Sequence, residues 1–135
     1  EEHGAELKQK GVLYINTDGN ERGFLGVEGS HDLEHFVNQV ANDVPDPESH
    51  ASVAERARAK IRLEALSPTS HDPSVVARLK DDAKLAADPT KDFPIGALGS
   101  GSDYSTFIEH LGLPALNVGY GSEGVAVFTG INYPF

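Results

Sequence analysis

The segment Leu98–Gly121, LGSGSDYSTFIEHLGLPALNVGYG, constrains the fold of this chain more than any other part of the sequence. A loop of glycine and serine runs into a short amphipathic helix, predicted over Asp103–Leu111. Gly112 and Pro114 end that helix, because glycine readily closes a helix in the left-handed conformation and proline cannot continue one. The apolar run Ala115–Gly119 then predicts a buried strand. A loop, a helix and a strand in succession are typical of layered α/β folds.

The rest of the chain predicts further strands that alternate with helices. The apolar run Val12–Asn16 (VLYIN) is rich in residues that favour β-structure, and it predicts a short buried strand. Gly23–Glu28 predicts a second short strand, and Asp18, Gly19 and Asn20 predict a turn between the two. This alternation favours an α/β fold with few strands and with helices packed on them.

Four more helices are predicted from capping residues and apolar periodicity. Ser52 and Glu55 have the spacing of a capping box, in which each side chain accepts a hydrogen bond from the other residue's backbone N–H. Asp72 is a good cap for a helix that begins at Pro73, because proline is favoured at the first helical position. Ser30 is the predicted cap of a helix with the apolar face Leu33, Phe36, Val37 and Val40. The four helices are predicted over Glu2–Lys10, His31–Asp43, Ser52–Ala65 and Pro73–Ala87.

Composition limits the function classes. The 135 residues suit a single domain over 1–135, in which 122–135 form an atypical tail without a clear period. A net charge of −10 disfavours nucleic acid as a partner, because a phosphate backbone needs clustered Lys and Arg. No apolar run reaches the length of about 18 residues that a membrane segment needs. Since the chain has no cysteine, a metal site must use His, Asp or Glu, which suit zinc or a harder divalent ion.

Two places carry side chains or backbone groups that bind ligands in other α/β proteins. Asp18 follows the predicted strand Val12–Asn16, and ligands of open α/β sheets bind beyond the carboxyl ends of the strands. Asp18 is therefore a candidate metal ligand, although an Asp that caps its own turn gives the same pattern. The loop of Gly99, Ser100, Gly101 and Ser102 precedes a helix start, where exposed backbone N–H groups attract anions. A simple tight glycine loop has the same sequence.

Three segments taken together resemble the M28 zinc metallopeptidases, the family of glutamate carboxypeptidase, related aminopeptidases and the transferrin receptor. They are GVLYINTDGN, SHDLEHFVNQVANDVPDP and LGSGSDYSTFIEHLGLPALNVGYG. The resemblance implies a partial three-layer α/β/α sandwich, the C-terminal part of a catalytic domain that holds two zinc ions and hydrolyses terminal peptide bonds. It implies that Asp18 is a zinc ligand and that Ser100, Gly101, Ser102 and Asn117 lie at the substrate cleft. It also implies an exported protein.

The chain departs from that family at several positions. Where glutamate-preferring members have arginines on the last strand, this sequence has Asn117 and Gly119, which cannot form bidentate pairs with a carboxylate. The general-base Glu, a His and a bridging Asp are expected upstream of residue 1, so no catalytic residue is assigned here. The last segment, GVAVFTGINYPF, lacks the final His ligand. We therefore expect an inactive fragment that does not hold zinc alone, because one Asp is not a zinc site. Exposed surface would favour self-association.

Two alternatives remain open. One is a catalytically inactive binding module like the transferrin receptor, in which the peptidase fold keeps only its partner contacts. The other is an H-x-x-E-H zinc protease, because His31, Glu34 and His35 match that pattern. His31 and His35 would then share one helical face as zinc ligands, Glu34 would be the general base and Glu109 a distant third ligand.

Overall fold

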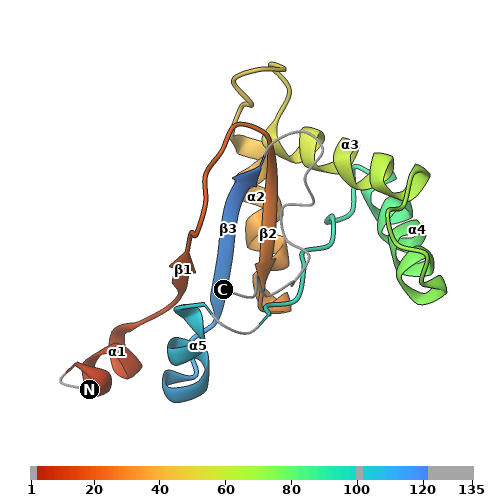
Figure 1. The fold of residues 1–135 in the computed structure, drawn as a ribbon. Coiled ribbons are helices and arrows are strands. Elements are labelled where there is room, and N and C mark those ends of the chain that lie inside the picture. The colour runs from red at the N-terminus through yellow and green to blue at the C-terminus, as the bar shows by residue number, and fades with distance from the viewer. Residues whose placement is uncertain (1–2, 100–101, 122–135) are drawn as a thin grey trace. The chain divides into compact units, whose positions relative to one another are not determined.

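The computed structural model describes residues 3–99 and 102–121 (Figure 1). Within these ranges the fold is mixed α/β, with five helices and a small three-stranded mixed sheet. The chain divides into two compact units, one formed by 1–33 and 95–135 and the other by Glu34–Pro94. The mixed α/β class predicted from the sequence is therefore confirmed at this level.

The sheet belongs to the first unit. Its strands are β1 (Tyr14–Asn16), β2 (Phe24–Gly29) and β3 (Ala115–Gly121). β3 lies between the other two, parallel to β1 and antiparallel to β2 (Figure 1). β3 is buried along most of its length because it pairs on both sides, as its apolar sequence predicts.

The prediction of a buried strand over Val12–Asn16 was partly wrong. The strand begins only at Tyr14, Val12 is 82% exposed, and Ile15 is 55% exposed. Among the described residues β1 pairs with β3 alone, so it forms an edge of this sheet. Val12 lies before the strand, and Ile15 points to the opposite face of the sheet from Tyr14 and the buried Asn16, because side chains alternate along a strand.

Two helices of the first unit meet near the beginning of β1. The first, α1 (Gly4–Lys10), ends at Gly11, where a Cβ atom would lie 2.5 Å from the Leu7 carbonyl oxygen. The second, α5 (Tyr104–Thr106), continues as a wider π-helical turn over Phe107–Leu111. The ring of Phe107 stacks on Tyr14, with ring centroids 3.8 Å apart. Gly112 closes the turn with φ 65°, which confirms the predicted glycine stop.

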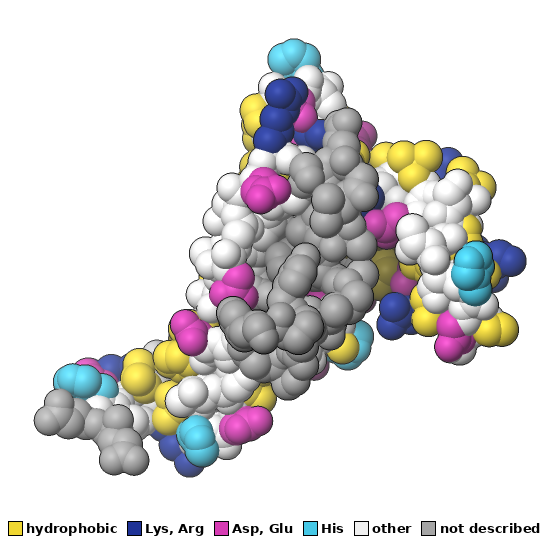
Figure 2. Space-filling model, in the orientation of Figure 1, with side chains coloured by type: hydrophobic (Ala, Val, Ile, Leu, Met, Phe, Trp, Pro, Cys, Tyr) yellow, Lys and Arg dark blue, Asp and Glu magenta, His cyan; other side chains and the backbone are white. Residues whose placement is uncertain are grey.

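The second unit is helical. It contains α2 (Glu34–Asp43), α3 (Val53–Leu66) and α4 (Pro73–Ala87), and α3 packs against both of the others. The capping box of Ser52 and Glu55 forms as predicted, and the Asp72 side chain accepts the Ser74 N–H at 2.8 Å. Its buried apolar residues are Val37, Ala41, Val53, Ala54, Ala57, Ala86 and Phe93. Other hydrophobic side chains remain on the surface over α3 and α4 (Figure 2).

The start of α2 differs from the prediction. His31–Leu33 form a 3₁₀ turn, and the α-helix begins only at Glu34. The hydroxyl of Ser30 accepts the backbone N–H of Ala115 on β3 at 3.4 Å, while the carbonyl of Ser30 accepts the N–H of Leu33. The side chain that was predicted to cap the helix thus bonds to the sheet.

The buried face of α2 is also rotated from the predicted one. Val37, Asn38 and Ala41 are buried, whereas Phe36 and Val40 are exposed. Asn38 points inward because its amide forms two hydrogen bonds, each 2.9 Å long, with the backbone C=O and N–H of Phe93. A polar side chain in this position joins α2 to the segment that follows α4.

The loop between α2 and α3 is organised by the buried carboxylate of Asp46. Its Oδ1 atom accepts the backbone N–H groups of Glu48 and Ser49 at 3.0 and 2.9 Å. The guanidinium of Arg56 donates to both carboxylate oxygens of Asp46 at 2.9 and 3.1 Å. Burial acts to raise the pKa of Asp46, but these hydrogen bonds outweigh it and lower the pKa to about 2.

Candidate functional site

A row of three polar side chains crosses the apolar sheet of the first unit. The strand register places Asn117 of β3 opposite Asn16 of β1 on one side and Glu28 of β2 on the other. Laterally paired residues project from the same face of a sheet, so the three side chains lie next to one another. All three are buried, with exposed fractions of 6% for Asn16, 4% for Asn117 and 7% for Glu28. Buried polar groups on this scale need hydrogen-bond partners.

Hydrogen bonds extend this row to the loop before α5 and to the end of β1. The amide nitrogen of Asn16 donates to Asn117 Oδ1 and to Ser102 Oγ, both at 3.0 Å. The hydroxyl of Ser102 in turn donates to Asp18 Oδ2 at 2.9 Å. Asp18 lies two residues beyond the carboxyl end of β1, where the sequence predicted it. The contacts bring together Asp18, Ser102 and Asn117, three of the residues predicted to lie at a site.

The other two predicted residues, Ser100 and Gly101, lie outside the described part of the chain. Two members of the network were not predicted, Asn16 and Glu28. Asn16 ends the apolar run VLYIN and Glu28 interrupts the run FLGVEG, and these polar residues beside apolar ones were the available signal. We name the five side chains Glu28, Asn117, Asn16, Ser102 and Asp18 the polar row.

Glu28 forms the buried end of the polar row. Its carboxylate lies opposite Asn117 in the strand register, and burial raises its pKa against the opposing effect of hydrogen bonding with the Asn117 side chain. The backbone of Gly96 bridges to β2 beside it, with hydrogen bonds to Val27 and Gly29 of 2.9 and 2.8 Å. A Cβ atom at Gly96 would lie 3.0 Å from Glu28 Cγ, so a side chain at residue 96 would crowd the aliphatic part of the Glu28 side chain. Glycine allows the close approach of this segment to Glu28.

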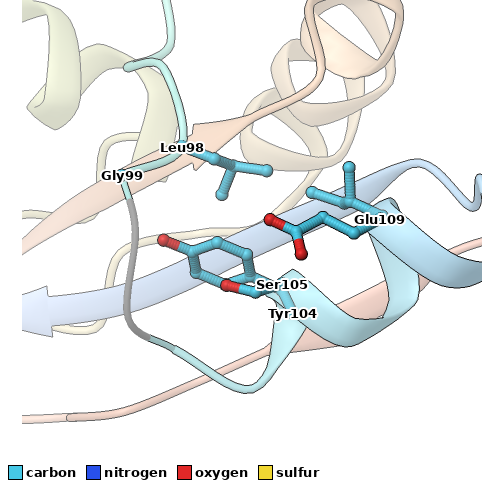
Figure 3. A pocket seen from close by; sticks show the side chains of 6 residues that line it. Leu98, Gly99, Tyr104, Ser105 and Glu109 are labelled. Atoms are coloured by element: carbon cyan, nitrogen blue, oxygen red, sulfur yellow. The ribbon is translucent and has the colours of Figure 1, made fainter.

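Tyr104, the first residue of α5, is buried near the polar row. Burial raises the pKa of its hydroxyl, and the negative charges of Glu28 and Asp18 raise it further. Hydrogen bonding with the backbone of Gly99 acts to lower this pKa, but it is the smallest of these effects. Tyr104 also borders a small cavity of about 240 Å³, around which Figure 3 shows the side chains of Leu98 and Glu109. The complete lining is Leu98, Gly99, Tyr104, Ser105, Ile108 and Glu109.

The polar row offers one carboxylate to a metal ion at its exposed end. Asp18 is exposed, and its Oδ2 is held by Ser102. Over 3–99 and 102–121, no three His, Asp or Glu side chains are grouped as a metal site requires. These residues therefore do not fit a zinc ion by themselves, because protein zinc sites use three or four ligands.

The H-x-x-E-H residues have a different local structure from the one that their pattern predicts. His31 lies in the 3₁₀ turn before α2, while Glu34 and His35 lie in α2 itself. The Nδ1 atom of His35 is 2.9 Å from Asp92 Oδ2. His31 and His35 therefore do not lie four residues apart in one continuous α-helix, the arrangement that gives two metal ligands a common face.

No family model matches this sequence, and no curated protein matches it. Among the described residues, no helix is both long and apolar enough to cross a membrane.

Proposed function

We propose that this chain forms part of the catalytic domain of an M28-like zinc exopeptidase, which hydrolyses terminal peptide bonds. The supporting observation is the hydrogen-bond path from Asp18 through Ser102 and Asn16 to Asn117. The family resemblance selects Asp18, Ser102 and Asn117 from two segments, and Asp18 and Ser102 are 84 positions apart in the sequence. Hydrogen bonds connect these residues near the end of a parallel strand, and this supports the proposal because α/β enzymes bind their ligands at such strand ends.

In this proposal each residue has a distinct role. Asp18 is the one zinc ligand that the chain provides, and Ser102 fixes the orientation of its carboxylate by donating to Oδ2. Asn117 lies at the wall of the cleft, and its neutral amide takes the place of an arginine. We therefore propose a substrate side chain other than glutamate, since an amide cannot neutralise a carboxylate.

The remaining zinc ligands and the general base belong, in this proposal, to a part of the protein outside this chain. Two zinc ions would supply Lewis-acid chemistry in the complete enzyme, and this chain would perform no catalytic step alone. The partial sheet would then be one side of a three-layer α/β/α sandwich. The exposed apolar side chains of Val12, just before β1, and of Ile15 on β1 are compatible with a covering segment or with a second copy of the chain.

The test uses the complete enzyme that this proposal describes. We expect zinc in the purified protein and hydrolysis of aminoacyl or N-acyl dipeptide substrates. Asp18→Asn should lower kcat/KM by more than about 100-fold, the upper end of the loss that outer-shell partners of a metal cause. Asp43→Asn, an exposed Asp at the end of α2, is the matched control and should leave kcat/KM unchanged.

Two other outcomes would contradict the proposal, and each would favour one of the two alternatives. A folded full-length protein without zinc and without hydrolysis would favour the inactive binding module. Zinc-dependent hydrolysis that depends on His31 but not on Asp18 would favour the H-x-x-E-H protease.

A further inference from the structure

In the polar row, the hydrogen-bonding capacity of each side chain determines which group donates and which accepts. Glu28 lies opposite Asn117 in the strand register, and a carboxyl oxygen accepts hydrogen bonds, so Asn117 turns its amide NH₂ toward Glu28. Its Oδ1 atom then faces Asn16, which must present its own NH₂ group. That NH₂ group also donates to Ser102, so the hydroxyl hydrogen of Ser102 is directed to Asp18. Each donor meets an acceptor along the whole path.

The two ends of the row are unequal. Both are carboxylates, but Glu28 is 7% exposed, whereas Asp18 is exposed and its bond to Ser102 lies at the surface. Water competes for a surface hydrogen bond, while a buried one has no such competitor. A reversed Asn117 amide would bring its oxygen against the Glu28 carboxylate and its NH₂ against the NH₂ of Asn16. The buried end therefore has the stronger influence on which way both amides point.

We propose that Glu28 is the positioning residue of this site, which sets the orientation of Asn117 and Asn16 and, through Ser102, holds the Asp18 carboxylate in place. The orientation of the amides stands on the geometry of the polar row alone. Its consequence for zinc binding rests on the proposed function. The two parts are tested by separate measurements, so that failure of one does not decide the other.

The experiment follows the side-chain NH₂ signals of Asn16 and Asn117 by ¹H–¹⁵N NMR. Glu28→Met removes the acceptor and keeps the length of the side chain. We expect both NH₂ groups to exchange with water about tenfold faster, the effect of losing one ordinary hydrogen bond. Glu28→Gln offers an amide oxygen to Asn117, so it should keep the exchange rates within about twofold of the wild-type values.

Two controls separate positioning from general loss of stability. Leu116→Ala removes a buried side chain of β3 and should destabilise the first unit. It should leave the NMR chemical shifts of the Asn16 and Asn117 NH₂ groups unchanged relative to each other. Asp18→Ala removes the exposed end and should leave the Asn117 NH₂ unchanged. The proposal is wrong if Glu28→Met leaves both exchange rates as in the wild type. It is also wrong if Leu116→Ala changes the two signals as much as Glu28→Met does.

Should Glu28→Met fail to fold, Glu28→Gln alone decides the question. Preserved slow exchange at Asn16 and Asn117 supports positioning by an acceptor at residue 28. Exchange as fast as that of the exposed Asn42 contradicts it. In the full-length protein, zinc affinity measured for the same Gln variant reports on the proposed function independently of the NMR result.

Discussion

Asn16 is the residue on which the connection between the predicted site positions depends. Its NH₂ group donates to both Asn117 and Ser102, and it is 6% exposed. Asn16→Ala removes both bonds and leaves the buried Oδ1 of Asn117 without this donor. A net hydrogen bond contributes about 0.5–1.5 kcal/mol, and a buried group left without its partner costs about 1–3 kcal/mol. We therefore expect Asn16→Ala to lower the free energy of unfolding by about 2–4 kcal/mol.

Urea denaturation followed by circular dichroism measures this change, because the chain has no tryptophan to report by fluorescence. Asn20→Ala is the matched control. Asn20 is exposed and donates only at the surface, to Thr17 at 2.8 Å, so its loss should cost less than about 0.5 kcal/mol. An Asn16→Ala protein as stable as the Asn20→Ala protein would show that the buried amide contributes no net stability, and it would refute the polar row as a structural unit.

Two further predictions concern the helical unit. Asn38→Ala should cost about 2–4 kcal/mol in urea denaturation, because the buried N–H and C=O of Phe93 lose their partners, whereas the exposed Asn42→Ala should cost almost nothing. The hydrogen bonds that lower the pKa of Asp46 to about 2, from backbone N–H groups and Arg56, stabilise the fold above the usual value of 3.8. This contribution should be lost as the pH falls from about 4 to 2, and a stability–pH profile of Asp46→Asn that is as steep as that of the wild type would contradict it.

Local chemistry predicted the boundaries of α3 and α4 well. The cap of Asp72, the start at Pro73 and the end at Ala87 agree with α4, and the capping box of Ser52 and Glu55 forms at α3. These signals act within a few residues, so they survive in any surrounding fold. The burial of β1 could not be predicted in this way, because it depends on which strands pair with it. That information lies about a hundred positions away, in β3.

The difference between local signals and distant strand pairing also explains which members of the polar row could be predicted from the sequence. Asp18, Ser102 and Asn117 were named from loop, cap and family patterns that can be read locally. Asn16 and Glu28 acquire their importance from the register, because both lie opposite Asn117 on the two neighbours of β3. A shift of either strand by one residue would turn its polar side chain to the other face. A polar residue inside a short apolar run marks a candidate, but only the pairing shows its partners.

Zinc titration by calorimetry tests most directly the claim that this chain supplies a single zinc ligand, Asp18. Wild type, Asp18→Ala and His31→Ala are titrated in parallel. We predict no binding tighter than about 1 mM in any of them, a level worth only about 4 kcal/mol. Tight binding that is lost in His31→Ala would contradict the account in favour of the H-x-x-E-H motif. Tight binding that is lost in Asp18→Ala would show instead that the chain completes a zinc site itself, alone or between copies.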